Sequence, residues 1–259
     1  MSSKLYRDVG IVLRTYKLGE ADRIVVILTQ EHGKVRAIAK GVRKTRSKFG
    51  GRLEPLSCVS IQLHRGKDLD VVSQVETVDA NSTVFGDLDS MTEAFAILEA
   101  VDQLVPDREP VPQIYKMLFG ARRTLLTRPS PIVVPAFLWK LLAAEGLRPQ
   151  LDTCASCGEN IGSARDGESR STYTFDLGLG GVLCRSCGSM SGSAISAEAL
   201  ELMRRILGGN LNEVLEEAYD PRGQHLDDPI VNEVLDIATR AFEHHMERRL
   251  RSVRIFERE

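Results

Sequence analysis

The hydrophobic pattern of this 259-residue chain changes its period near residue 80. Before that point, short runs such as residues 23–29 and 34–40 are rich in β-branched residues or alternate apolar with charged side chains, which is typical of strands. After it, apolar residues recur every three or four positions, as they do on the buried face of a helix. A chain with its strands first and its helices afterwards belongs to the α+β class, with separate β and α parts.

The first 80 residues contain five runs with strand character. These runs cover residues 9–14, 23–29, 34–40, 58–64 and 69–78. Gly33 and Gly66 lie in the polar stretches before the third and the fifth run, where turns are expected. Five strands in a segment of this size form a small barrel, and we therefore predict a five-stranded OB-fold domain over residues 1–80.

Helical periodicity dominates the remainder, so we predict a helical domain over residues 81–259. Helices are expected at residues 91–105, 114–125, 135–145, 197–207, 211–218 and 229–251. Ser90 and Glu93 have the spacing of a capping box at the start of the first of these helices. Residues 150–192 lack periodicity, and we predict that they form an insertion within the helical domain.

Four of the five cysteines lie in this insertion as two C-x-x-C pairs. The pairs are Cys154 with Cys157 and Cys184 with Cys187, and a glycine follows each pair. Four thiolates around one tetrahedral site select Zn²⁺ over hard cations, so we predict one structural zinc ion without an open position for catalysis. Disulfides, a redox C-x-x-C pair and unrelated thiols are the alternatives. The lone Cys58 has the alternating context of a small core residue.

A basic segment begins in the third predicted strand, where residues 34–52 carry eight cations and no acid. The cations are Lys34, Arg36, Lys40, Arg43, Lys44, Arg46, Lys48 and Arg52. A solvated charge run is the alternative, but such runs normally mix both signs, so this pattern favours a site for the phosphate backbone of nucleic acid. The scarcity of aromatic residues in the β region predicts phosphate contacts, weak sequence preference and a steep salt dependence.

Charge and motif content narrow the function further. Residues 1–80 carry a net charge of +6 and residues 81–259 a net charge of −8, which together give the −2 of the whole chain. Such asymmetry suggests two domains, of which one meets a polyanion. The sequence lacks Walker, dinucleotide-binding and zinc-protease motifs, so we expect no enzyme. It also lacks a secretory signal and an apolar stretch long enough to cross a membrane, so we expect a cytoplasmic protein.

Several short motifs occur in a fixed order along the chain: GIVLR at residues 10–14, GK at 33–34, AKGVR at 39–43, LEP at 53–55, the two cysteine pairs and RRLRS at 248–252. Taken in this order, they resemble the bacterial RecO family of recombination mediators over essentially the whole chain. The resemblance implies an N-terminal OB-fold, a helical domain with a zinc module, and no hydrolytic activity. It also implies binding of single- and double-stranded DNA, annealing of complementary strands, and partnership with RecR and the C-terminal tail of SSB. Through these partners the family helps to load RecA onto SSB-coated DNA, so we expect a nucleoid-associated location.

Two other functions remain open at this point. One is a zinc-containing protein-interaction adaptor with an OB-like barrel and no DNA role of its own. The other is a zinc-dependent nucleic-acid enzyme, which would need an open metal position or clustered carboxylates. If the family function holds, we expect the acidic SSB tail to bind the helical domain, where Trp139 stands among Arg122, Arg123 and Lys140.

Overall fold

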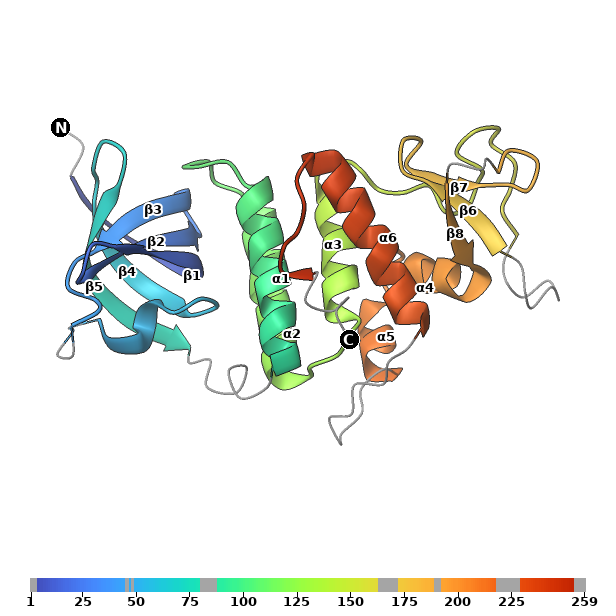
Figure 1. Cartoon of the computed structure of the whole chain (residues 1–259). Coiled ribbons are helices and arrows are strands. Elements are labelled where there is room, and N and C mark those ends of the chain that lie inside the picture. Colours follow the sequence, from blue (N-terminus) through green and yellow to red (C-terminus); the bar gives the residue numbers. More distant parts are fainter. Residues whose placement is uncertain are drawn as a thin grey trace. The chain divides into compact units, whose positions relative to one another are not determined.

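The structure is a computed structural model that describes residues 4–44, 47, 49–79, 88–162, 172–188, 192–217 and 229–253. The chain divides into two compact units, Met1–Leu126 and Thr127–Glu257. Within the described ranges, the first unit contains five strands and two long helices, and the second contains four helices and a three-stranded sheet (Figure 1). Each unit therefore combines sheet and helix.

The first unit begins with a closed barrel in the strand order β1-β2-β3-β5-β4, drawn in blue to teal in Figure 1. Its strands are β1 (Leu5–Leu18), β2 (Asp22–Thr29), β3 (Gly33–Ala39), β4 (Cys58–His64) and β5 (Asp70–Asp79). Neighbouring strands pair antiparallel except β3 and β5, which pair in parallel through Ala37 with Asp70 and Ile38 with Val71. This topology is that of an OB-fold, so the predicted α+β class and the N-terminal OB-fold are confirmed.

The barrel core follows from alternation along the strands. On β3, Val35, Ala37 and Ala39 point inward and are fully buried, whereas Lys34 and Arg36 lie on the outer face. Phe49 and Leu53, around the short helix η1 (Gly50–Leu53), add to the same core. β1 is longer at both ends than its predicted run, because exposed residues at these ends weaken the apolar signal.

The helices α1 (Leu88–Leu104) and α2 (Pro112–Thr127) belong to the same compact unit as the barrel. Arg14 on β1 pairs with Asp102 on α1 at 2.7 Å. The buried Arg122 on α2 donates hydrogen bonds to the carbonyl of Leu56 and to the carboxylate of Asp79 on β5, both at 2.8 Å. The unit therefore extends beyond the change of period near residue 80.

The capping box predicted at Ser90 and Glu93 is wrong, because α1 already begins at Leu88. Ser90 and Glu93 are both buried within the helix, and the hydroxyl of Thr92 donates a hydrogen bond to the carbonyl of Leu88. Leu88 is 71% exposed and adds nothing to the apolar periodicity from which the helix start was predicted. The apolar pattern of the sequence therefore did not indicate the first turn of α1.

The second unit packs helices against a small sheet. Its elements are α3 (Val133–Ala144), β6 (Thr172–Asp176), β7 (Gly181–Leu183), β8 (Ser193–Ser196), α4 (Ala197–Leu207), α5 (Leu211–Glu217) and α6 (Pro229–Met246), with the sheet order β7-β6-β8. The apolar α3 packs against α4 and α6, and the ring of Trp139 lies 5.8 Å from that of Phe175 on β6. Among the described helices, none is both long and apolar enough to cross a membrane.

The last helix is shorter than its predicted range of residues 229–251, because α6 ends at Met246. Glu247 follows with a φ of 51°, which takes the backbone out of the helix. The N–H of Leu250 then donates to the carboxylate of Glu243 instead of a helical carbonyl. Leu250 and Val253 are buried and continue the apolar pattern after the helix has ended, which explains why periodicity alone overestimated its length.

Candidate metal centre and nucleic-acid interface

Two loops beside β7 carry the four paired cysteines. Cys154 and Cys157 lie in the loop after α3, and Cys184 directly follows β7. The N–H of Ala155 in the first loop donates to the carbonyl of Val182 on β7 at 2.9 Å. This backbone contact holds together two loops that are far apart in the sequence.

The structure brings together all four cysteines that were predicted as metal ligands. Their Sγ atoms lie within 4.8 Å of one another, and those of Cys157 and Cys184 are 3.7 Å apart. Sulfurs placed tetrahedrally around a zinc ion at about 2.3 Å would be about 3.8 Å apart, so the cluster fits an all-thiolate site. The cysteines are free of disulfides, and Cys58 is buried on β4, outside the cluster.

Glycine is favoured after each cysteine pair, but for a different physical reason in each case. Gly158 has a φ of +77°, and its N–H donates to the carbonyl of Cys154 at 2.9 Å, so this turn uses the left-handed conformation. Gly188 makes the equivalent bond to Cys184 at 2.8 Å without a positive φ. A Cβ on Gly188 would lie 3.2 Å from Oγ1 of Thr174, so space favours glycine there.

The backbone around the cluster favours a thiolate. A hydrogen bond from the backbone of Cys184 lowers the pKa of Cys154 to about 6, with further contributions from the backbones of Cys157 and Ser156. The thiolate is the form of cysteine that binds metals. The loops therefore favour the thiolate form of Cys154, whereas the pKa values of Cys157, Cys184 and Cys187 are raised in the same cluster.

The basic segment lies along the outer side of β3 and the turn that follows it. Arg36, Lys40, Arg43, Lys44 and Arg52 are exposed, whereas Arg46 and Lys48 lie outside the described residues. The guanidinium of Arg43 donates to the carbonyls of Gly19 and Glu20 at 3.2 and 3.0 Å. These bonds join the turn after β3 to the turn between β1 and β2, so both turns lie at one end of the barrel.

Lys34 differs from the exposed cations of the segment because its side chain is largely buried and its ammonium lies beside carboxylates of its own unit. Its side chain is only 11% exposed, and its ammonium donates to the carbonyl of Asp102 at 2.6 Å. The carboxylates of Asp102 and Asp107 each lie 3.5 Å from the same ammonium. Lys34 is therefore less available to an external phosphate than the exposed cations that follow it in the sequence.

A buried carboxylate, Asp70, organises the barrel where β3 meets β5. It accepts hydrogen bonds from Arg108 at 2.8 Å, from the backbone of Gly66 at 2.9 Å and from the hydroxyl of Tyr6. Burial opposes its ionisation, but these bonds outweigh burial and hold the pKa of the Asp70 carboxyl below its usual value. The sequence predicted a turn at Gly66, and no sequence signal pointed to Arg108 as the partner of Asp70.

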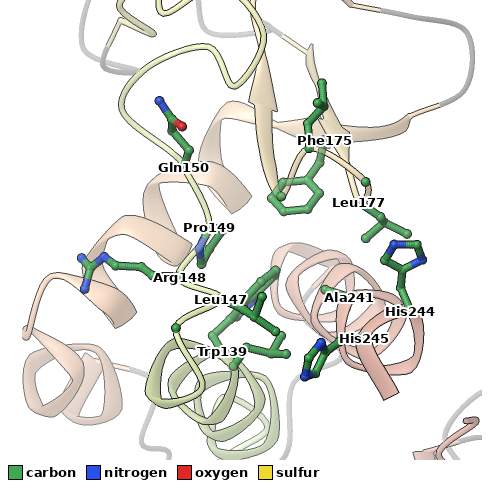
Figure 2. A pocket seen from close by; sticks show the side chains of 15 residues that line it. Trp139, Leu147, Arg148, Pro149, Gln150, Phe175, Leu177, Ala241, His244 and His245 are labelled. Carbon is green, nitrogen blue, oxygen red and sulfur yellow. The ribbon is translucent and has the colours of Figure 1, made fainter. Parts of the chain in front are cut away.

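The second unit also contains a pocket of about 500 Å³ (Figure 2). Its apolar walls include Trp139 from α3, Leu147 from the following loop, and Phe175 and Leu177 from the β6 side. Arg148, His244 and His245 supply polar and cationic groups, the two histidines from the end of α6 (Figure 2). The indole Nε1 of Trp139 is buried and has no hydrogen-bond partner among the described residues.

One of the residues that the sequence suggested for a peptide site lines this pocket. Trp139 lines it, but Arg122 does not, because that side chain is buried in the first unit against Asp79 and Leu56. Lys140 is half-buried outside the pocket, and burial lowers its pKa. The residues that sequence reasoning missed, His244 and His245, adjoin the pocket through the packing of α6 against α3.

Comparison with known proteins gives two further findings. A family model described as Recombination protein O N terminal matches residues 1–81, and one described as Recombination protein O C terminal matches residues 86–254. The chain is also 39% identical over 261 residues to a DNA repair protein RecO of Cutibacterium acnes. That similarity covers 98% of this chain and 99% of the relative.

Proposed function

Because the chain belongs to the RecO family of DNA repair proteins, we propose that it is a recombination mediator that binds single- and double-stranded DNA, anneals complementary strands and helps to load RecA onto SSB-coated DNA. The observation that carries this proposal is the exposed cluster of Lys40, Arg43 and Lys44 at the end of β3 in an OB-fold barrel. No acid interrupts residues 34–52, so the cluster suits a phosphate backbone.

Annealing follows from this charge distribution without a chemical step. Two complementary strands repel each other through their phosphates, which slows their encounter. A surface that neutralises phosphates on both strands lowers the repulsion and raises the local strand concentration, and base pairing then completes the reaction. No catalytic residue is needed for this role, so the proposed mediator is not an enzyme.

The DNA site is tested by the triple variant Arg43→Ala, Lys44→Ala and Arg46→Ala in the full chain. If the segment neutralises roughly six phosphates, the log–log salt slope of duplex binding is about −5 in the parent and shrinks by up to about 3 in the variant. Affinity falls about equally for all sequences, because phosphates are the same everywhere.

The matched control removes three exposed cations elsewhere, Lys116, Arg123 and Arg128. This control is expected to keep the parent slope. An unchanged slope in the basic-segment variant, or an equal loss in the control, contradicts the proposed DNA site. Absence of salt-dependent DNA binding in the parent supports the adaptor function instead. Annealing of SSB-coated complementary strands by the same proteins then tests the mediator role directly.

We also propose that the cysteine cluster holds one Zn²⁺ through Cys154, Cys157, Cys184 and Cys187. Soft thiolate donors at this spacing match zinc, and four protein ligands leave no position for a substrate. When bound, the ion supplies folding free energy to the loops beside β7.

The pocket of the second unit is our candidate for the SSB tail. An acidic peptide with an apolar end needs an apolar cavity with cations beside it, and the pocket offers both. The unpartnered indole Nε1 of Trp139 is a donor that a peptide oxygen would satisfy. RecR and, indirectly, RecA complete the proposed partners, which place the protein in the cytoplasm at the nucleoid.

Replacement of Leu179 tests this pocket. Leu179 lines the pocket and is 54% exposed, so Leu179→Asp puts a negative charge at the peptide site with little cost to folding. We expect at least tenfold weaker binding of a labelled SSB-tail peptide. Val78→Asp on β5 is the control, because Val78 has the same 54% exposure. Equal peptide affinity in Leu179→Asp and the parent contradicts the assignment.

A further inference from the structure

The outer face of the barrel carries a short apolar row across three strands. Tyr16 on β1 pairs directly with Ile24 on β2, and Ile24 pairs with Ile38 on β3. Their neighbours Val25 and Ala37 point into the core, so the row faces outward. Tyr16 is 39% exposed, and the two isoleucines are half-buried.

Cations border this row along β3. Arg36 and Lys40 are the exposed residues two positions before and after Ile38, so they flank it on the same side of the strand. Arg14, two positions before Tyr16, holds its guanidinium 4.7 Å from the centre of the Tyr16 ring. Of the acids near the row, Asp102 pairs with Arg14 and Glu54 pairs with Arg23, and the carboxylate of Asp22 accepts a hydrogen bond from the backbone of Gly41 at 2.7 Å.

Tyr16 is also distinct from the other aromatic residues of the β region. The β region of the sequence has only three residues of the Phe, Tyr and Trp types, Tyr6, Tyr16 and Phe49, and this scarcity disfavours a site built on base stacking. In the structure Phe49 is 1% exposed in the core, and Tyr6 is half-buried against His32, with ring centroids 4.3 Å apart. Of these three rings, Tyr16 alone is exposed beside the cations.

We propose that Tyr16 stacks on an unpaired base and makes the barrel favour single-stranded over double-stranded DNA. The inference rests on the proposed DNA-binding function and adds a specificity-determining residue to it. Cations on both sides of the row hold phosphates of one strand, while its bases lie on the apolar strip of Tyr16, Ile24 and Ile38. In a duplex the base faces are stacked inside the helix, so only the phosphate contacts remain.

The first experiment measures the affinity of the full-length Tyr16→Ala variant for a single-stranded oligonucleotide and for its duplex. Loss of one aromatic stacking contact weakens single-strand binding by roughly 5- to 150-fold. Duplex affinity and the thermal midpoint stay near the parent values. Tyr16→Phe and Tyr16→Trp restore single-strand affinity because they keep the ring, whereas Tyr16→Leu does not. Phe119→Ala is the control, since Phe119 is an aromatic residue with 40% exposure on α2.

The second experiment replaces the bases instead of the tyrosine. An abasic single strand carries the same phosphates but offers nothing to stack on. The parent is expected to bind it more weakly than an oligothymidine strand by the factor that Tyr16→Ala loses, and Tyr16→Ala to bind both strands alike. If the variant discriminates the strands as strongly as the parent, or if it weakens duplex binding equally, the stacking role is overturned.

The Tyr16 variant and the basic-segment variant together distinguish a wrong stacking role for Tyr16 from a wrong DNA-binding function of the barrel. If Tyr16→Ala is silent while the Arg43, Lys44 and Arg46 variant weakens both forms of DNA, the barrel binds DNA through phosphates alone. If the basic-segment variant is silent as well, the DNA-binding function assigned to the barrel is itself wrong. The two sets of variants on the same oligonucleotides separate these outcomes.

Discussion

The ion pair between Asp70 and Arg108 shows how two single residues connect the barrel to the loop between α1 and α2. β3 and β5 pair through only two residue pairs, so few backbone bonds close the barrel there. Asp70 lies at this closure, fully buried, and Arg108 reaches it from the loop between α1 and α2. The ion pair therefore joins the barrel to the segment that connects the two helices.

Arg108→Ala is predicted to destabilise the first unit by about 1–3 kcal/mol at pH 7, a range reduced from that of fully buried pairs because Arg108 is 36% exposed. The Asp70 pKa is lowered in the fold, so its ionised form stabilises the protein above the unfolded value of about 3.9. This contribution is lost as pH falls through the folded pKa.

The difference in unfolding free energy between parent and Arg108→Ala should therefore shrink as pH falls below about 4. Urea unfolding at several pH values measures it. Arg7→Ala is the matched control, because the Arg7 guanidinium donates to Gln62 at 2.7 Å on an exposed surface. A variant whose deficit stays constant, or grows, toward low pH would show that Asp70 is not the group involved.

At the scale of elements, the start of β3 depends on a close approach by the loop after α1. Gly33 has a φ of +69°, and a Cβ there would lie 2.0 Å from the carbonyl oxygen of Glu109. The N–H of Arg108 also donates to the carbonyl of Lys34 at 2.9 Å. Glycine is therefore needed at this position for space as well as for conformation.

Gly33→Ala and Gly19→Ala separate these two requirements. Gly19 has a similar φ of +59° with nothing near its Cβ position, so its replacement costs only about 1–2 kcal/mol for the left-handed conformation. Gly33→Ala adds a clash and is expected to cost about 2–5 kcal/mol in urea unfolding. Equal losses in both variants would mean that the loop after α1 moves away freely.

The cysteine module gives a second prediction at this scale. Cys184→Ser removes one of four ligands, so bound zinc measured by atomic absorption should fall from one per chain to near zero. The thermal midpoint should fall by about 10 °C, because metal affinity contributes to folding free energy. Cys58→Ala is the control, since Cys58 is buried outside the cluster and its loss leaves zinc content unchanged. Full zinc occupancy in Cys184→Ser, or none in the parent, rules out the proposed site.

For the whole molecule, the proposed DNA and peptide sites lie in different compact units. We predict that their variants separate two functions. Leu179→Asp loses SSB-tail binding and annealing on SSB-coated strands but keeps annealing of bare strands. The variant of Arg43, Lys44 and Arg46 loses both annealing reactions and keeps tail affinity. Annealing assays with and without SSB, together with peptide titration, measure the pattern, and a loss of tail binding in the basic-segment variant would contradict it.

Local spacing was enough to predict much of this molecule. Alternation along residues 34–40 and 58–64 identified β3 and β4 because a strand presents successive side chains to opposite faces. The two-residue gap within each cysteine pair predicted shared ligation, and the four Sγ atoms do lie together. The uniform charge of residues 34–52 predicted a phosphate-binding site, which stays a prediction, and five of its eight cations are exposed: Arg36, Lys40, Arg43, Lys44 and Arg52. These features depend on neighbours a few positions apart.

Tertiary structure decided what depends on distant partners. Asp102 partly neutralises Lys34 although the two residues are 68 positions apart, and Arg108 pairs with Asp70 although they are 38 positions apart. The apolar periodicity of these segments therefore could not indicate either contact. Packing also selected Tyr16 over Tyr6 and Phe49 as the exposed ring. The physical reason is that a side chain's exposure and electrostatic partners are set by which surfaces meet on folding, whereas strand alternation and knuckle turns are set by the backbone within a few residues.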